Sequence, residues 1–216
     1  MIELIKKIEE EKIIVIVRGV KKENLIPLAT AMYNGGIKLL ELTYSANGSI
    51  SDEETAENIR ILSEQFAGKM DIGAGTVLTE KQVELTKKAG GKFIISPDSY
   101  DKVIKKTKEL GLVSMPGALT PSEIQSAHRA GADFIKLFPI DNFGVSYLKA
   151  VKAPLSHIKF LAVGGVDENN MSTYLKAGVC GFGIGSNIVK KDLIEKGDFD
   201  AITKLAKKYV SVVKNS

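Results

Sequence analysis

The chain has 216 residues, 44% hydrophobic and 26% charged, with a formal net charge of +4. This length allows one α/β barrel or two small domains, and no Pro/Ser-rich linker divides it, so we expect a single domain over residues 1–216. The lysines are spread along helix-like stretches, which is typical of solvated faces, so no nucleic-acid or membrane partner is expected. One cysteine, Cys180, excludes a disulfide framework, and Met1–Lys12 lacks the apolar core of a signal peptide. We therefore expect a cytoplasmic protein.

In chain order, helical patterns alternate with short apolar strands. After the amphipathic segment 1–12, strands are expected at 13–18, 37–43, 70–73, 92–96, 112–115, 132–136, 158–163 and 179–182. Five of these eight strands directly follow a glycine and a sixth, at 70–73, follows Gly68 after one residue. Glycine is the usual residue just past a helix end because it accepts the left-handed conformation. The strands are apolar throughout, which suits a parallel sheet buried on both faces.

Helix starts support the same alternation. Thr79 and Thr120 each stand three residues before Gln82 or Glu123, the spacing of a capping box. Eight strand-helix units without a long insertion predict a single (β/α)8 TIM barrel with an extra N-terminal helix. The alternative, an open doubly wound sheet, is disfavoured because Arg18-Gly19-Val20 is not a dinucleotide-binding glycine motif.

Lys136 stands out because it lies in the middle of an apolar strand, between Ile135 and Leu137. Burial there disfavours the charged ammonium and lowers its pKa. A neutral amine attacks carbonyl compounds to form Schiff bases. The alternative is a structural lysine whose stem packs while its ammonium reaches water.

Side chains alternate between the two faces of a strand, and this alternation allows Lys136 to share the inner face of the barrel with two other ionisable residues. Arg18, Glu41 and Lys136 lie toward the ends of their strands on parities that allow all three to face the barrel axis, and Thr43 shares the parity of Glu41. The three could form an ion network that only holds the barrel together. In the functional interpretation, Arg18 binds a substrate carboxylate and Glu41 acts as general acid and base.

The ends of the last two strands are rich in glycine. Gly164-Gly165 follows the seventh strand, and 183–187 follows the eighth and is expected to open a short helix. Loops at these positions of a barrel often bind phosphate through backbone N–H groups.

Thr76 and Pro97 stand at the ends of the third and fourth strands. His128 and His157 lack metal-ligand spacing, so no metal site is predicted.

Together these motifs resemble the family of 2-keto-3-deoxy-6-phosphogluconate (KDPG) and 4-hydroxy-2-oxoglutarate (KHG) aldolases. The resemblance runs from about residue 12 to residue 190. It is carried by Val17-Arg18, Glu41-Leu42-Thr43, Gly73-Ala74-Gly75-Thr76-Val77, Ile95-Ser96-Pro97, Met115-Pro116-Gly117, Lys136-Leu137-Phe138-Pro139, Gly164-Gly165-Val166 and Gly185-Ser186.

The resemblance implies a class I aldolase that needs no metal or other cofactor and is usually a homotrimer. The resemblance implies that the substrate is a small, phosphorylated 2-keto acid and that pyruvate is released. Lys136 would be the Schiff-base lysine and Glu41 the acid/base residue. Substrate-binding roles would fall to Arg18, Thr43, Thr76, Pro97, Phe138, Gly164, Gly165, Gly185 and Ser186.

Two positions depart from the family pattern. Some members carry an arginine where this chain has Ser45, and the residue before Gly164 is commonly threonine but is Val163 here. Loss of that hydroxyl removes a polar substrate contact, so KDPG, its galactonate epimer and KHG all stay open as substrates. Two other functions are alternatives: a transferase resembling thiamine-phosphate synthase, and a non-catalytic sugar-phosphate-binding protein.

Overall fold

The computed structural model describes all residues, 1–216, and consists of alternating strands and helices. The strands are β1 (Ile13–Val17), β2 (Leu39–Thr43), β3 (Asp71–Gly75), β4 (Phe93–Ile95), β5 (Val113–Met115), β6 (Gly117–Ala118), β7 (Ile135–Leu137), β8 (Phe160–Val163) and β9 (Gly181–Ile184). The helices are α1 (Ile2–Glu11), α2 (Lys22–Asn34), α3 (Asp52–Gln65), α4 (Glu80–Lys88), α5 (Asp101–Glu109), α6 (Pro121–Arg129), α7 (Gly144–Lys152), α8 (Met171–Lys176), α9 (Lys191–Glu195) and α10 (Phe199–Lys214).

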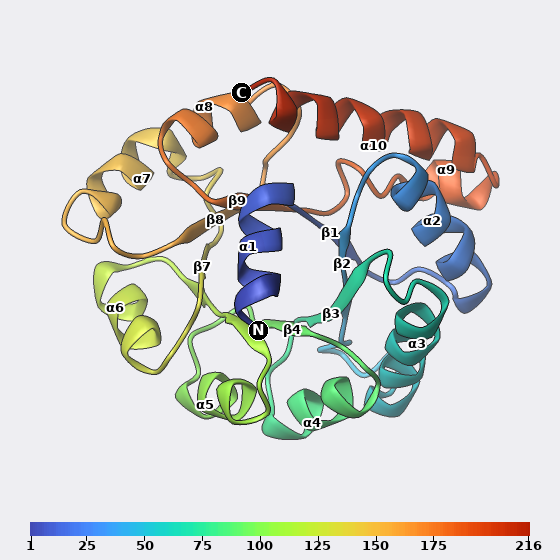
Figure 1. Cartoon of the computed structure of the whole chain (residues 1–216), viewed down its shortest axis with the longest axis horizontal. Helices are drawn as coiled ribbons and strands as arrows, with labels where there is room; N and C mark the ends of the chain where they lie inside the picture. The colour runs from blue at the N-terminus through green and yellow to red at the C-terminus, as the bar shows by residue number, and fades with distance from the viewer.

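The strands form one parallel sheet in the order β5-β4-β3-β2-β1-β9-β8-β7-β6, and the helices surround it (Figure 1). The fifth predicted strand, 112–115, is observed as β5, and a further short strand that was not predicted, β6, follows it after Pro116, which has no N–H to donate. The sheet closes on itself there, because Phe134 N–H donates to the Ser114 carbonyl at 3.2 Å and Lys136 N–H to the Pro116 carbonyl at 2.9 Å. The predicted TIM barrel is confirmed, with its fifth strand in two pieces.

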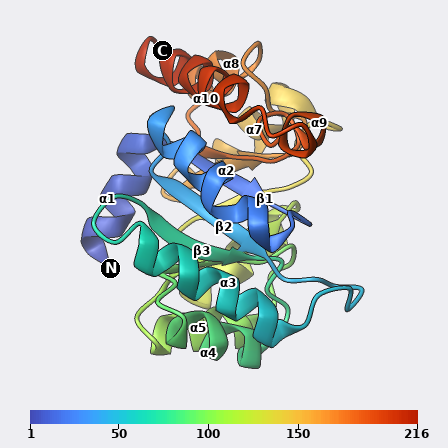
Figure 2. The same ribbon diagram turned by 90° about the vertical axis from the view of Figure 1, so that its right-hand side faces the viewer.

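The barrel has an inner core separate from the packing between sheet and helices. Ten buried side chains form this inner cluster: Ile8, Ile14, Leu39, Phe93, Ile95, Val113, Met115, Phe134, Leu161 and Val163. All but Ile8 come from strands or their immediate flanks. Ile8 belongs to α1, which crosses one opening of the barrel, while the loop between β2 and α3 extends from the opposite end (Figure 2). The amphipathic N-terminal helix is therefore a plug that leaves only the carboxyl ends of the strands open.

The predicted helix ends and starts are confirmed. Glycines that precede strands have positive φ values, for example +96° at Gly36 and +106° at Gly131. Thr79 and Thr120 both make capping boxes.

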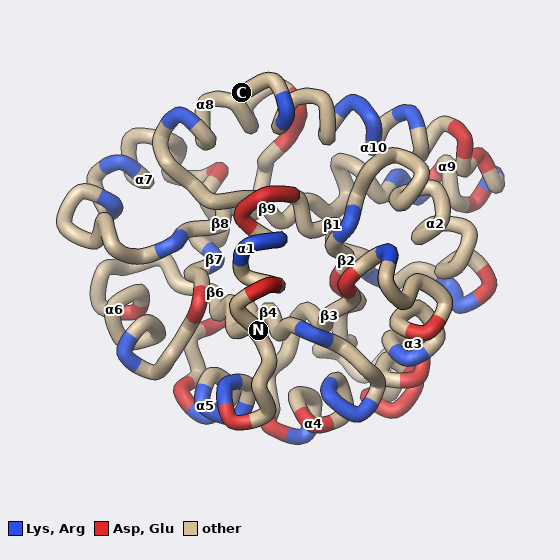
Figure 3. Tube along the Cα trace, viewed as in Figure 1, with Lys and Arg blue, Asp and Glu red and all other residues tan.

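Charged residues of both signs are intermixed on the outer helices (Figure 3). No helix combines the length and the apolar character that crossing a bilayer requires.

Asp71, at the start of β3, ties the plug to the barrel. Its carboxylate lies 2.7 Å from both the Lys7 ammonium of α1 and the Lys92 ammonium. Burial acts to raise the pKa of Asp71, but the hydrogen bonds from the two lysines outweigh it and hold the pKa below its ordinary value. Asp71→Asn is expected to lower the free energy of unfolding at pH 7 by about 2 kcal/mol, because two ammonium groups lose their counterion. Urea denaturation measures this change.

A matched control for this substitution is Glu53→Gln. Glu53 pairs with Lys81 at 2.8 Å, but both side chains are about two-thirds exposed, at 66% and 63%. Solvent screens such a pair, so the control is expected to change stability by less than about 0.5 kcal/mol. Equal effects of the two substitutions would show that Asp71 does not anchor α1.

Candidate active site

Glu41 of β2 and Lys136 of β7 lie together inside the barrel, where both side chains line the same small cavity. The exposed fraction is 1% for Glu41 and 8% for Lys136. Both line a cavity of about 10 Å³, which is about the smallest space that holds one water. The rest of its wall is apolar or glycine: Ile14, Ile16, Ile95, Leu161, Val163 and Gly183. A carboxyl group and an amine therefore share a small, largely apolar cavity, as parity predicts.

Burial changes the proton affinity of both groups in opposite directions. It raises the pKa of Glu41 to about 7, and the positive charges of Lys136 and Arg18 only partly offset this effect. It lowers the pKa of Lys136, against the attraction of the Glu41 carboxylate and with the help of the Arg18 charge. Near neutral pH the amine is thus easier to deprotonate and the carboxyl easier to protonate than in water, which suits a nucleophile beside an acid/base group.

The three ionisable residues do not form the ion network considered as an alternative. None of the ion pairs within 4 Å includes Arg18, Glu41 or Lys136. The Glu41 Oε2 atom is buried without any hydrogen-bond partner. The Lys136 Nζ instead lies 4.8 Å from the ring centre of Phe138. A buried polar atom without a partner costs stability, so its presence here indicates a group kept free for a ligand or a reaction.

Gly75 provides the space in which the Glu41 carboxylate sits. A Cβ atom at Gly75 would collide with Glu41 Oε1 and would lie 3.1 Å from Thr43 Cγ2. This role was not predicted from the sequence, where Gly75 stands out only as part of a motif. Its parity, which matches that of Thr43 in the neighbouring strand, is the signal that could have revealed it.

Arg18 follows β1 and Thr76 follows β3, and their side chains are in contact at the barrel mouth, the open end formed by the carboxyl ends of the strands. Arg18 Nη2 donates to Thr76 Oγ1 at 3.0 Å. Thr76 has a φ of +56°, an unfavourable value for a β-branched residue, and such strain is concentrated at functional sites. Ser45 uses its hydroxyl within its own loop, donating to Asn47 Oδ1 at 2.7 Å. Arg18 is therefore the cation that the structure places near the two reactive groups.

The other predicted pocket residues lie at the rim. Thr43 is half-buried at the end of β2, and Pro97 is exposed after β4. Phe138 follows Lys136 by two residues and is 38% exposed. These side chains surround the mouth and do not reach the cavity that Glu41 and Lys136 line.

The two glycine loops are neighbours, linked by a hydrogen bond of 2.8 Å from Asn187 Nδ2 to the Val166 carbonyl. Residues 185–189 form a single hydrogen-bonded turn, so the expected short helix is wrong there. Gly164 and Gly165 have φ values of +98° and +63°. Asp141 packs against this first loop, with its Oδ2 2.8 Å from where a Gly165 Cβ would be. Asp141 was not predicted from the sequence; it lies here because Ile140 N–H donates to the Val163 carbonyl and holds the segment after β7 beside this loop.

The family model of KDPG and KHG aldolase matches residues 4–205. The chain belongs to the KDPG and KHG aldolase family. A KHG/KDPG aldolase of Escherichia coli is 34% identical over 90% of this chain and 88% of the relative. A probable 2-dehydro-3-deoxy-6-phosphogalactonate aldolase of Rhizobium meliloti is 36% identical over 84% of this chain and 83% of the relative.

A solved structure of the same family extends the comparison to the fold. It is a KDPG aldolase from Legionella pneumophila with pyruvate captured as a covalent carbinolamine intermediate. Its TM-score with this aldolase chain is 0.82, at 29% identity, and the match covers 91% of this chain and 93% of that one. The family assignment made from the sequence motifs is confirmed.

Proposed function

We propose that this chain is a class I aldolase in which Lys136 is the Schiff-base nucleophile and Glu41 the general acid and base. The observation that carries the proposal is the small, largely apolar cavity that these two groups share, with burial shifting both pKa values toward neutrality. The substrate is a 2-keto-4-hydroxy acid. Cleavage of KDPG or its galactonate epimer yields pyruvate and glyceraldehyde 3-phosphate, and cleavage of KHG yields pyruvate and glyoxylate.

The reaction begins when the neutral Lys136 amine attacks the C2 ketone of the substrate. Glu41 in its protonated form gives a proton to the departing hydroxyl, so that water leaves and an iminium ion forms. The Glu41 carboxylate then takes the proton of the C4 hydroxyl while the C3–C4 bond breaks, and the electron pair moves into the iminium to give an enamine. The aldehyde product departs at this stage.

Glu41 is protonated again after bond cleavage and donates that proton to C3 of the enamine. Hydrolysis of the resulting pyruvate iminium frees pyruvate and restores the Lys136 amine. We propose that no metal takes part, because the iminium polarises the reacting carbon as a Lewis acid otherwise would. Family membership supports this lyase chemistry over the transferase and the non-catalytic binding protein.

In this proposal the remaining site residues bind the substrate. Arg18 and Thr76 hold the substrate carboxylate, Thr43, Pro97 and Phe138 line the mouth, and Gly164, Gly165, Gly185 and Ser186 lie at the phosphate end. We also propose the homotrimer usual in this family, on the family resemblance alone.

Arg18→Ala is expected to raise KM for the keto acid by roughly 10- to 100-fold, because a charge-assisted hydrogen bond to the carboxylate is lost. The kcat value is expected to change less than KM, because Arg18 makes the smallest of the three contributions to the pKa of Lys136 and of Glu41. Stability is expected to be retained, because the Arg18 side chain is exposed and bonds only Thr76. Steady-state kinetics with KDPG measures the first two effects.

Arg18→Lys is the matched variant for this experiment. It keeps the charge but loses the paired N–H donors of the guanidinium, so it should recover part of the lost affinity. If KM stays at the wild-type value in Arg18→Ala, Arg18 does not bind the carboxylate.

A further inference from the structure

Asparagine stands directly before glycine at two positions of the chain, Asn34 before Gly35 and Asn47 before Gly48. The backbone nitrogen that follows an asparagine attacks the side-chain amide carbon when the two atoms come together. Glycine favours this reaction because it has no side chain to block the approach. Ring closure also requires the asparagine backbone to rotate away from a helical conformation. The structure places these two identical dipeptides in opposite surroundings.

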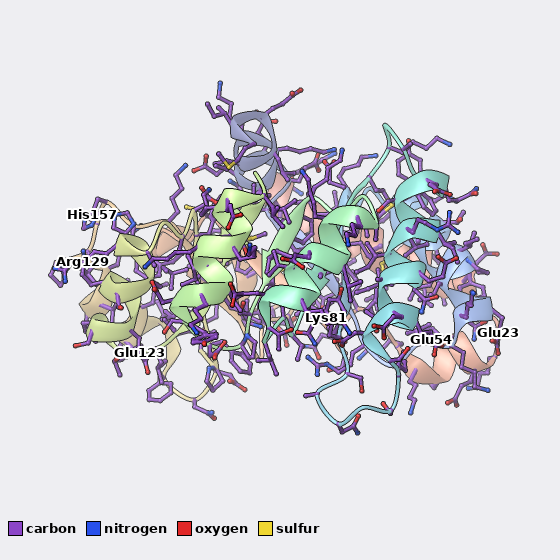
Figure 4. All side chains as sticks on the ribbon, turned by 90° about the horizontal axis from the view of Figure 1, so that it is seen from below. Glu23, Glu54, Lys81, Glu123, Arg129 and His157 are labelled. Carbon is purple, nitrogen blue, oxygen red and sulfur yellow. The ribbon has the colours of Figure 1, made fainter.

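Asn47 lies in the β2–α3 loop, residues 44–51, which projects from the end of the molecule opposite α1 (Figure 4). Asn47 and Gly48 are both exposed. The Gly48 N–H donates to the Ser45 carbonyl at 3.2 Å, a bond within the loop, and a Cβ atom at Gly48 would have no neighbour within 4 Å. Rotation of the peptide between Asn47 and Gly48 therefore breaks no hydrogen bond of a helix or strand.

The side-chain carbonyl of Asn47 is polarised by two hydrogen-bond donors. Ser45 Oγ donates to Asn47 Oδ1 at 2.7 Å, and the Ser49 N–H donates to the same oxygen at 3.1 Å. Ser49 Oγ lies 2.8 Å from Ser45 Oγ and donates to it, which leaves the Ser45 proton for Asn47. Attack on the amide carbon places negative charge on Oδ1, so these donors stabilise the tetrahedral intermediate as an oxyanion hole does.

Asn34 is held in an unreactive conformation. It is the last residue of α2, and the Gly35 N–H donates to the Ala31 carbonyl at 3.0 Å. Gly35 is buried against α10, where a Cβ atom would collide with Ala206 and lie 3.0 Å from the Thr203 carbonyl oxygen. Reaction at Asn34 therefore requires the end of α2 to unwind and to separate from α10.

We infer that Asn47 is a self-modification site, at which the folded protein loses ammonia and gains a carboxylate. The Gly48 nitrogen gives its proton to solvent and bonds to Asn47 Cγ. The bond from Cγ to Nδ2 then breaks, ammonia leaves, and a five-membered succinimide remains. Water opens this ring at either carbonyl and leaves aspartate or isoaspartate at position 47. The formal net charge of the chain falls from +4 to +3, and the new negative charge lies in a loop at the barrel mouth.

The test follows both asparagines in the same full-length protein, incubated at mildly alkaline pH and analysed by peptide mass spectrometry. Deamidation is expected at least about 10-fold faster at Asn47 than at Asn34, because the helix end must open before Asn34 reacts. In concentrated urea the two sites should react at similar rates, since the dipeptide is the same and the fold is lost. Equal rates in the folded protein, no reaction at Asn47, or a faster reaction at Asn34 would overturn the inference.

Two variants test the chemistry at Asn47. Gly48→Ala should slow the reaction roughly 10-fold, because a methyl group hinders the attacking nitrogen. Ser45→Ala should slow it roughly 3-fold or more, because one donor to Oδ1 is lost while Ser49 keeps the other. An unchanged rate in Ser45→Ala would show that the hydrogen bonds do not activate the amide. Slow reaction at Asn34 in the same samples verifies that each variant is folded.

Discussion

Lys136→Met is expected to abolish cleavage of all three candidate substrates, with a fall in kcat of about 10⁴-fold or more, as expected when a covalent nucleophile is removed. Borohydride added in the presence of pyruvate should attach a pyruvate-derived mass to Lys136 in the wild type and none in the variant. Peptide mass spectrometry locates the label. The fold should be retained, because an apolar side chain of similar length replaces a buried amine with no ion pair.

Two further variants make this experiment decisive. Lys136→Arg keeps a positive charge, but the guanidinium does not lose its proton and should be equally inactive. Lys207→Met changes an exposed lysine of α10 and should retain full activity and labelling. Labelling at another lysine, or full cleavage by Lys136→Met, would show that the nucleophile has been misassigned.

Glu41→Gln is expected to lower kcat by about 10²- to 10⁴-fold, because the amide neither takes the C4 hydroxyl proton nor protonates the enamine. In the wild type, kcat/KM should rise with pH through about 7, where Glu41 becomes the carboxylate that accepts this proton. The variant should lack this inflection. Kinetics from pH 5 to 9 measure both effects, and an unchanged inflection would assign it to another group.

The same substitution should increase stability above pH 7. The pKa of Glu41 rises from 4.5 to about 7 on folding, so its contribution to stability is fully present below pH 4.5 and is lost as pH rises through about 7. The loss is about 3 kcal/mol. Glu41→Gln avoids it, and urea denaturation at pH 4.5 and pH 8 should show a gain over the wild type only at pH 8. Opposite effects on activity and stability are typical of a group retained for catalysis.

The sequence pattern predicted the barrel because each local signal agreed with the others. The glycine ends, the capping boxes of Thr79 and Thr120 and the apolar strands all indicate the same strand-helix unit. Parity also brought Glu41 and Lys136 together correctly, because alternation along a strand fixes the face on which a side chain lies. Strand limits were less accurate, as shown by β3, predicted at 70–73 but found at Asp71–Gly75.

What the sequence could not predict depends on contacts between distant segments. The fit of Glu41 against Gly75 depends on how β2 and β3 are tilted, which the residue pattern does not specify. The hydrogen bond from Arg18 to Thr76 joins two loops across β2. Asp141 reaches the Gly164–Gly165 loop because the segment after β7 lies beside the end of β8, where Ile140 N–H donates to the Val163 carbonyl. Each of these features is set by tertiary packing rather than by local sequence.

Closure of one barrel end by α1 has a consequence for the order of events during turnover. Because Ile8 is packed into the barrel interior at the α1 end, we expect molecules to reach the reaction cavity from the opposite end, where the strands have their carboxyl ends. The departing aldehyde and the water that hydrolyses the pyruvate adduct are then expected to pass through this same open end in succession. While the aldehyde occupies it, access of bulk water to the enamine is restricted, so the enamine can recondense with the aldehyde before it is protonated, and the same site catalyses the reaction in both directions.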